Sequence, residues 1–366
     1  MAPMRPAPLF RKVAIAGVGL IGGSIGLGIR QRFLAESVIG LDPDPEALDT
    51  AQWTGVIDET ELEPGPWLRD VDLVILAAPV RCQVELAGTL APHLGPDTIV
   101  TDVGGVKADI VASLSHLRFV GGHPMAGSER TGVLHADAAL LENAVWVLTP
   151  VEETDQEAFG QVQEFVTLLG ARPITVQPAQ HDRLVAAVSH VPYLTAVALT
   201  QLVSEDRDRD LMMLLAAGGF RDLTRVASGS PRMSRDMVAG NRSTVTSTAA
   251  ELTRHLERLV EQLGEPEELL DSARRAKRTR DSLPIVRRSL LPRRWEITIA
   301  VPDQPGQLAI ITRALGEAQV NIKDIEVLGI RETGGAVRLA FDDEDGMRRG
   351  SIALKREGYE IRGRGT

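Results

Sequence analysis

A glycine-rich turn near the N-terminus, Gly17-Val-Gly19-Leu-Ile-Gly22, has the spacing of a dinucleotide-binding loop. It follows an apolar run, residues 13–16, and precedes a helical pattern over residues 24–30. The first glycine permits a tight turn, the second lets backbone amides approach a pyrophosphate, and the third lets the helix pack closely. We therefore predict that the phosphates of a dinucleotide are bound by Gly17, Gly19, Leu20, Ile21 and Gly22.

A carboxylate lies where the ribose of such a cofactor would be held. Asp42 ends the next apolar run, 20 positions after Gly22, and an acidic residue at this spacing accepts hydrogen bonds from ribose hydroxyls. Residues 43–46 add two acids and no Lys or Arg, and they would repel a 2′-phosphate. The pattern predicts NAD and not NADP, with a glycine turn in a nucleotide-free domain as the alternative.

A histidine follows a predicted strand in the stretch Gly121-Gly122-His123-Pro124. The carboxyl edge of a parallel sheet is where such domains bind ligands. A neutral imidazole titrates in the range needed to accept a proton while a hydride leaves. We expect His123 to be a catalytic base, and an incidental surface histidine is the alternative.

Two further stretches carry candidate polar groups. His181-Asp182 and Ser189-His190 lie on one long predicted helix, where regular α-helical geometry points the two histidines in opposite directions. This argues against a shared metal, and no metal-ligand spacing occurs elsewhere, so we predict no metal site. Ser189 and His190 could instead satisfy buried hydrogen bonds.

Arg225 lies among apolar residues in the stretch 218–227. An unpaired guanidinium would be costly there, so it should bind either a substrate carboxylate or the nearby Asp222.

The composition excludes several classes of protein. Of the 366 residues, 43% are hydrophobic and 25% charged, which is ordinary for a globular protein, and only 4% are aromatic. The net charge of −10 argues against partners that are nucleic acids or anionic membranes. Cys82 is the one cysteine, so no intrachain disulfide can form. No apolar run is expected to approach membrane-spanning length, and we expect a cytoplasmic protein.

Three segments of different character follow one another. Residues 10–177 alternate apolar runs with helical patterns, typical of a Rossmann-type doubly wound sheet; strands are expected at 13–16, 38–41, 73–78, 99–101, 119–121, 145–148 and 174–176. Residues 178–290 predict an all-helical domain whose apolar helices favour a homodimer. Residues 294–366 follow a ferredoxin-like β-α-β-β-α-β order.

Taken in order along almost the whole chain, these stretches resemble the prephenate dehydrogenase family of the type that carries a C-terminal ACT domain. The motifs that carry the resemblance are the glycine-rich turn, Thr101-Asp102-Val-Gly-Gly-Val-Lys107, Gly-Gly-His123-Pro-x-Ala-Gly-Ser128-Glu129, His181-Asp182…Ser189-His190-x-Pro, and Gly-Gly-Phe-Arg-Asp-x-Thr-Arg225.

The resemblance implies NAD-dependent oxidative decarboxylation of prephenate to 4-hydroxyphenylpyruvate, in tyrosine biosynthesis. His123 would take the proton of the C4 hydroxyl while carbon dioxide leaves and the ring aromatises. Arg225 would hold a substrate carboxylate with help from Ser189 and His190. Ser128 and Glu129 would line the pocket, and the cofactor site would be completed by Ala78, Pro79 and Asp102.

Two positions depart from the family pattern. Gly105 stands where the family usually has a serine close to the catalytic histidine, and Ser234 stands where members often carry a tryptophan. In the last segment, Val301-Pro-Asp303-Gln-Pro-Gly306 and Asn321-Ile322 resemble the ligand loop and following strand of ACT domains. This implies feedback inhibition, most plausibly by tyrosine; a domain that only dimerises is the alternative.

Three other functions stay open at this point. An arogenate dehydrogenase would share the fold and the cofactor. A β-hydroxyacid dehydrogenase would be expected to show a catalytic lysine on the first long helix, and residues 180–206 contain none. A non-catalytic amino-acid sensor would keep the cofactor fingerprint but would have lost catalysis through Gly105.

Overall fold

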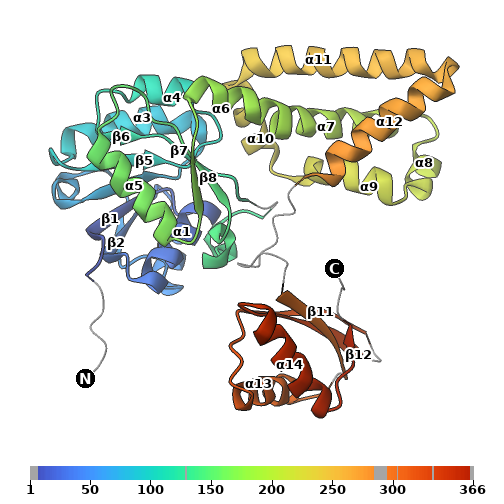
Figure 1. Cartoon of the computed structure of the whole chain (residues 1–366). Coiled ribbons are helices and arrows are strands. Elements are labelled where there is room, and N and C mark those ends of the chain that lie inside the picture. Colours follow the sequence, from blue (N-terminus) through green and yellow to red (C-terminus); the bar gives the residue numbers. More distant parts are fainter. Residues whose placement is uncertain (1–6, 128–129, 284–294, 303, 332–333, 363–366) are drawn as a thin grey trace. The chain divides into compact units, whose positions relative to one another are not determined.

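The structure is a computed structural model that describes residues 7–127, 130–283, 295–302, 304–331 and 334–362. Its contacts divide the chain into two units, Met1–Pro284 and Ile285–Thr366, which are drawn in Figure 1. The first unit contains an α/β part followed by a helical part, and the second is a smaller α/β unit. This order agrees with the predicted succession of folds.

A six-stranded parallel sheet forms the centre of the first unit, in the order β3-β2-β1-β4-β5-β6. Its strands are β1 (Phe10–Ala16), β2 (Ala35–Leu41), β3 (Glu59–Glu61), β4 (Leu73–Leu76), β5 (Ile99–Asp102) and β6 (Phe119–Val120). The order reverses between β1 and β4, and in Rossmann-type sheets the dinucleotide binds across that point at the carboxyl ends of the strands.

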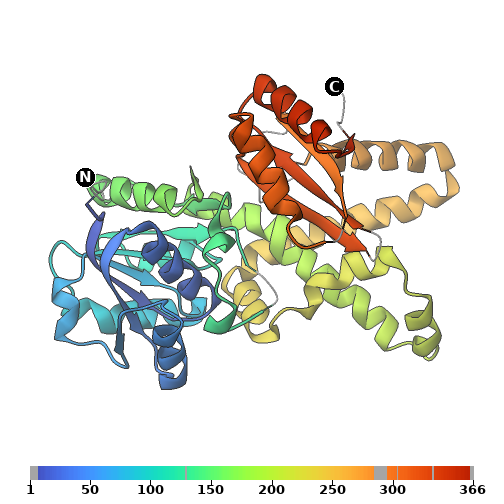
Figure 2. The same ribbon diagram turned by 90° about the horizontal axis from the view of Figure 1, so that it is seen from below.

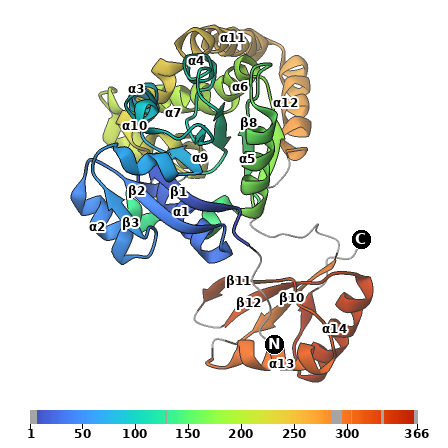
Figure 3. The same cartoon turned by 90° about the vertical axis from the view of Figure 1, so that its left-hand side faces the viewer.

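Helices cover both faces of this sheet, because successive strand residues point to opposite sides. One core contains residues of α1 (Leu20–Arg32), α2 (Pro45–Trp53) and α5 (Gln156–Leu168). The core on the opposite face contains residues of α3 (Val80–Leu90) and α4 (Ala108–Ser113). Figure 3 shows α1 and α2 beside β1 and β2. Each fully buried aliphatic side chain of these cores contributes about 1.5–3 kcal/mol.

The last predicted strands of this part do not join the parallel sheet. A separate three-stranded sheet contains β7 (Gly122–Pro124), β8 (Val145–Leu148) and β9 (Arg172–Thr175), with β7 antiparallel to β8. Only Gly121 separates β6 from β7, whereas a parallel crossover needs a dozen residues or more. The chain therefore begins a new sheet, and His123 lies on one of its strands.

The helical part begins with an interrupted helix. Its segments are α6 (Pro178–Val185), a π-helical turn (Ala186–His190) and α7 (Val191–Ser204). The later helices are α8 (Arg209–Leu215), α9 (Gly218–Thr224), α10 (Pro231–Gly240), α11 (Arg242–Glu261) and α12 (Pro266–Asp281). Figures 1 and 2 show these later helices extending from the end of the α/β part at which α6 leaves it.

Much of the apolar surface of this helical part is exposed in a single chain. The side chains of Val188, Leu202, Leu214 and Leu215 are 69% to 80% exposed. Within the described ranges, the segment Pro178–Ser204, 27 residues, is also long and apolar enough to cross a membrane. The expectation that no run approaches that length is therefore wrong, although an apolar helix at a protein contact has the same composition.

The second unit has the predicted β-α-β-β-α-β order. Its elements are β10 (Glu296–Val301), α13 (Gln307–Glu317), β11 (Asp324–Arg331), β12 (Gly334–Ala340), α14 (Glu344–Arg356) and β13 (Ile361–Arg362). The sheet order is β11-β12-β10-β13, with antiparallel neighbours. Ile299, Ile311, Leu339 and Leu354 are fully buried in its core, so this unit has a hydrophobic core of its own.

Candidate active site

The glycine-rich turn meets the end of β4. Gly17 has φ +105°, and a Cβ added there would lie 2.6 Å from the backbone of Ala77 and Ala78, so only glycine fits. A Cβ at Gly19 would meet nothing within 4 Å. Gly19 caps α1 without a side-chain hydrogen bond, which leaves the amides of the first turn for a ligand. Open space in front of a helix N-terminus fits a pyrophosphate.

Asp42 ties this turn to the end of β2. Its Oδ2 accepts a hydrogen bond from the Val18 amide at 3.1 Å, and its Oδ1 accepts one from the Asp44 amide at 3.0 Å. The carboxylate is therefore oriented before any ligand arrives, and each oxygen keeps a further lone pair. Asp44 and Glu46 are exposed beside it, which fits a ribose with free hydroxyls better than a phosphorylated one.

Ala78 and Pro79 form the opposite side of the crevice. The Ala78 carbonyl accepts a hydrogen bond from Gln83 Nε2 at 2.9 Å, and Pro79 is the N-cap of α3. The helix behind the loop thus fixes the loop that the glycine turn approaches. The structure therefore brings together these two residues and the predicted phosphate-binding turn at one sheet edge.

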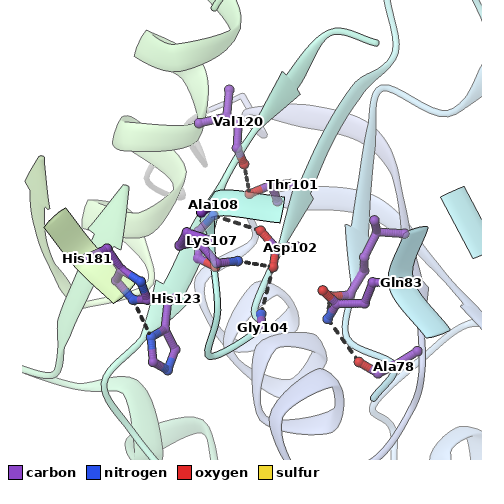
Figure 4. Close-up of polar contacts among 12 residues, drawn as sticks. Ala78, Gln83, Thr101, Asp102, Gly104, Lys107, Ala108, Val120, His123 and His181 are labelled. Carbon is purple, nitrogen blue, oxygen red and sulfur yellow. Dashed lines mark hydrogen bonds and ion pairs between the residues drawn. The ribbon is translucent and has the colours of Figure 1, made fainter. Parts of the chain in front are cut away.

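Asp102 and Lys107 form an ion pair whose side chains are both 0% exposed. Asp102 Oδ1 accepts from the Gly122 amide at 2.9 Å and Oδ2 from the Gly104 amide at 2.8 Å, while Lys107 Nζ donates to the Gly122 carbonyl at 3.0 Å. Figure 4 shows this pair. Asp102 is fully buried and holds Gly104, Lys107 and Gly122, so in this structure it positions the strand of His123, and these contacts give no sign of the direct cofactor contact that was expected.

His123 projects from β7 toward α6. Its Nδ1 lies 2.9 Å from His181 Nε2, and His181 Nδ1 lies 2.8 Å from Asp182 Oδ1; Figure 4 shows the two rings meeting. His123 is half-buried, whereas His181 is 1% and Asp182 is 4% exposed. An Asp–His–His chain therefore ends at the predicted base.

Asp182 is a branching point of the hydrogen-bond network. Its carboxylate also accepts from the backbone amides of Lys107 at 2.8 Å and Ala108 at 2.9 Å, at the start of α4. Its carbonyl accepts from Asn241 Nδ2 at 2.7 Å, and that nitrogen lies 3.3 Å from His190 Nδ1. His190 and His123 are thus parts of one buried network.

The two helix histidines were expected to point in opposite directions, and that expectation assumed a regular α-helix. The π-helical turn Ala186–His190 gives each residue a smaller rotation. As a result, His181 and His190 are both buried, each at 1% exposed. Ser189, beside His190, is half-buried.

The surroundings favour the neutral forms of His123 and His190. Burial, together with the charge of Lys107 and the neighbouring His181 and His190, lowers the pKa of His123 well below its usual value. Burial also lowers the pKa of His190 to about 4, although Asp182 opposes the shift. Burial works to raise the pKa of Asp182, but hydrogen bonds from His181 and from two backbone amides outweigh it, so this pKa is lowered.

The remaining predicted residues lie elsewhere or outside the description. Arg225 begins a short helical turn after α9 and is exposed in the single chain, so it is not buried among apolar side chains as expected. Ser128 and Glu129 lie outside the described residues. Within the described part of the chain, no group of three His, Cys, Asp or Glu side chains could hold a metal ion.

The two departures from the family pattern differ in their surroundings. A Cβ added at Gly105 would lie 3.7 Å from His123 Nε2, with Met237 Cγ at 3.9 Å. These are ordinary contact distances, so a serine would fit. Ser234 lies in α10 and is 5% exposed.

A cavity of about 260 Å³ lies in the second unit, between the N-terminus of α13 and the strands β11 and β12. Gly306 is among its lining residues, together with Pro302, Gln304, Gln307, Leu308 and Val327. Asn321 and Ile322 are not; Asn321 is exposed and Ile322 packs against the core. Asp303 lies outside the described residues.

Sequence reasoning named His181, Asp182 and Lys107 only as parts of motifs and gave them no role. Their contacts join positions as much as 75 residues apart, which spacing cannot reveal. The sequence feature that could have indicated these contacts is the pair His181-Asp182, since two adjacent ionisable residues on a buried helix require hydrogen-bond partners.

Comparisons with known proteins identify the family of the chain. The family models for the nucleotide-binding domain and the dimerization domain of prephenate dehydrogenase match residues 25–175 and 177–271. A prephenate dehydrogenase of Bacillus subtilis is 34% identical over 361 residues, covering 95% of this chain and 97% of that protein.

Solved structures resemble the first unit. Prephenate dehydrogenase from A. aeolicus, in complex with hydroxyphenyl propionate and NAD+, has a TM-score of 0.72 and 32% identity, covering 75% of this chain and 98% of that one. Synechocystis arogenate dehydrogenase has a TM-score of 0.67 and 31% identity, covering 75% and 100%. With both domain models matched in order and one relative aligned almost end to end, the chain belongs to the prephenate dehydrogenase family of NAD-dependent oxidoreductases.

Proposed function

We propose that this chain oxidises prephenate with NAD and releases carbon dioxide and 4-hydroxyphenylpyruvate, with His123 as the base. The observation that carries the proposal is the position of His123: its Nδ1 is engaged by His181, and its Nε2 lies on the side of Gly105, 3.7 Å from the place of a Cβ added there. Burial favours the neutral imidazole, and Nε2 is the nitrogen left to accept a proton from a hydroxyl donor.

The chemistry demands orientation more than acid–base strength. The C4 hydroxyl gives its proton to His123 Nε2 as hydride leaves C4. The bond from C1 to the carboxylate then breaks, its electron pair completes the aromatic ring, and the proton returns to the product oxygen. When bound, NAD supplies the hydride acceptor; Gly19, Leu20, Ile21 and Asp42 would hold it.

The same proposal gives roles to residues near the helical part. Arg225 binds a substrate carboxylate through its planar fork, and Ser189 and His190 help to orient it. Ser128 and Glu129 line the entrance. We divide the chain into domains at 10–177, 178–290 and 294–366, supported by the match limits at 175 and 177.

We further propose a homodimer. Apolar side chains of α7, α8 and α11 are exposed in one chain, including Leu202, Leu214 and Val260, and so many large apolar side chains exposed on one helical part favour an interface. The match to a dimerization domain covers the same helices. A second copy would cover this face and shield Arg225.

The second unit is proposed to be an ACT domain that binds tyrosine as a feedback inhibitor. Support comes from its β-α-β-β-α-β order and from the cavity at Gly306, whose lining is largely apolar apart from two glutamines. Such a cavity suits the ring of an aromatic amino acid better than a strongly charged ligand.

The decisive test mixes purified full-length chain with NAD and prephenate, or with arogenate, and follows NADH. We expect turnover of prephenate, reduced on the order of 10³-fold in His123→Asn and unchanged in His116→Gln, which alters an exposed histidine. Turnover with arogenate alone would keep the mechanism and change the substrate. No NADH from either substrate would refute the proposed activity, and inhibition by tyrosine tests the regulatory part separately.

A further inference from the structure

We propose that His181 and Asp182 are positioning residues for His123: they keep its proton on Nδ1, leave Nε2 as the acceptor, and share the positive charge when Nε2 is protonated. This rests on the proposed role of His123 as the base. It also bears on the glycine at position 105: that residue lies beside Nε2, on the other side of the ring, so the orienting hydrogen bond from α6 to Nδ1 does not depend on a serine there.

The contacts of Asp182 determine which nitrogen of His181 carries a proton. Its carboxylate lies within 2.9 Å of the amide nitrogens of Lys107 and Ala108 and of His181 Nδ1. The two amides can only donate, so the carboxylate is an acceptor, and His181 Nδ1 must carry a proton toward it. A neutral His181 then has a lone pair on Nε2.

The contact between His181 and His123 determines which nitrogen of His123 carries a proton. His181 Nε2 lies 2.9 Å from His123 Nδ1, and a bond at this length needs one proton. With His181 neutral, that proton belongs to His123 Nδ1, and His123 Nε2 is left unprotonated. The opposite arrangement, a doubly protonated His181, would force a proton onto His123 Nε2 and prevent it from accepting one.

The groups that face the two rings set the charge around them. Lys107 brings a positive charge that Asp102 balances, and His190, whose pKa burial lowers to about 4, is neutral at physiological pH. Asp182 lies against His181 Nδ1 and can stabilise a cation that forms on His181 when His123 accepts a proton. When His123 Nε2 accepts the substrate proton, the Nδ1 proton can move to His181 Nε2. The cation then lies against Asp182, and the proton returns by the same path.

Other residues also hold Asp182 and His123 in place. Asp182 is fixed by the start of α4, which it caps, and by Asn241, which donates to its carbonyl at 2.7 Å. His123 is fixed by the β7–β8 ladder and by the Asp102–Lys107 pair around Gly122. Neither ring can turn without breaking a buried hydrogen bond, which is the condition for a locked tautomer.

The first experiment observes the tautomer directly. Histidine-selective ¹⁵N labelling of the full chain gives signals for seven histidines, and His123→Asn and His181→Gln identify the two of interest. We expect His123 to carry its proton on Nδ1 in the unsubstituted chain and to shift toward Nε2 in His181→Leu. A proton on Nε2 of His123 in the unsubstituted chain would overturn the proposal.

The second experiment measures catalysis. We expect kcat for prephenate to fall about 100-fold in His181→Leu, while the KM for NAD changes less than about 3-fold. In His181→Gln, kcat should be about 10-fold higher than in His181→Leu, because the amide oxygen of glutamine can accept a hydrogen bond from His123. Asp182→Asn should resemble His181→Gln, and His116→Gln should match the unsubstituted chain. A rise in KM as large as the fall in kcat, or a kcat for His181→Gln as low as that of His181→Leu, would indicate a merely structural role.

The two proposals can fail separately. If neither prephenate nor arogenate is oxidised, yet His123 shows the Nδ1 proton, the proposed function is refuted and the tautomer lock stands. If prephenate is oxidised and His123 carries its proton on Nε2, the function stands and the lock is refuted.

Discussion

The surroundings of His123 and those of Arg225 are built by opposite means, although both belong to the proposed active site. Around His123, the Asp102–Lys107 pair and the Asp182–His181 chain are buried and hydrogen-bonded within one molecule. Arg225 is itself exposed, as is Leu223 of α9 shortly before it along the chain. The proposed base is therefore preorganised by a single chain, while the proposed carboxylate-binding side depends on what covers these helices.

The largest expected effect concerns the exposed leucines of the helical part. Leu214→Glu should weaken the dimer about 10²–10⁴-fold, because covering a leucine contributes about 1.5–3 kcal/mol and a two-fold interface counts it twice. Sedimentation at a series of concentrations measures the change. Leu62→Glu, an equally drastic change at another exposed leucine, should leave the assembly state unchanged. Equal behaviour of the two variants would contradict the proposed interface.

The next largest effect concerns the buried Asp102–Lys107 pair. Lys107→Met leaves Asp102 charged and unpaired in the core, and we expect the free energy of unfolding to fall by about 3–5 kcal/mol. Arg11→Gln, which removes an exposed pair with Asp72 at 3.0 Å, should cost no more than about 1 kcal/mol. Urea unfolding of both variants decides the matter; a loss for Lys107→Met as small as the control would mean that the pair is not buried in solution.

The buried histidines predict how stability depends on pH. Their pKa values are lower in the folded than in the unfolded chain, so unfolding takes up protons. The free energy of unfolding should therefore be highest above pH 6.5 and fall as the pH drops toward 4, by about 1–3 kcal/mol for His190 alone. The lowered pKa of Asp182 acts only below this window.

Urea midpoints at several pH values measure this slope. His190→Gln should flatten it, whereas His116→Gln should not, since that side chain is exposed. A slope that is identical in all three proteins would show that the network around Asn241 does not hold His190 neutral.

The smallest effect concerns Gly105. A Cβ at this position would make only ordinary contacts with His123 Nε2, so Gly105→Ser alone should change kcat by less than about 3-fold. In a His181→Leu background, the same substitution should raise kcat more than it does alone, because a serine on the Nε2 side would help to hold the ring that has lost its Nδ1 partner. Additive effects of the two substitutions would mean that they do not share a function.

The sequence was sufficient for the parts of the fold that follow from local pattern. The strands 38–41 and 145–148, the helix capped by Asp155, and the order of the second unit all appear at or near their expected bounds. The strand Glu59–Glu61 is short and polar, and Gly122–Pro124 is bounded by a glycine and a proline. Neither has the apolar alternation that identifies a strand.

Some single residues of the candidate site could be picked out of the sequence, but their arrangement could not. His123 and Asp42 could be singled out because each follows a strand at the expected spacing. The contact between His123 and His181 depends on how β7 packs beside α6, and the burial of His190 depends on a π-helical turn. Exposure of Arg225 likewise depends on tertiary and quaternary packing, which a single sequence does not encode in any local pattern.

The π-helical turn makes the site depend on the geometry of one helix as well as on its residue types. Each of its five residues, Ala186–His190, turns the chain by less than the 100° of an α-helix. If the same residues took regular α-helical geometry, all of α7 would turn further relative to α6, while the helix content would hardly change. A substitution that favours the regular helix here would therefore separate His190 from Asn241 and redirect the exposed apolar face, a defect without any unfolded protein.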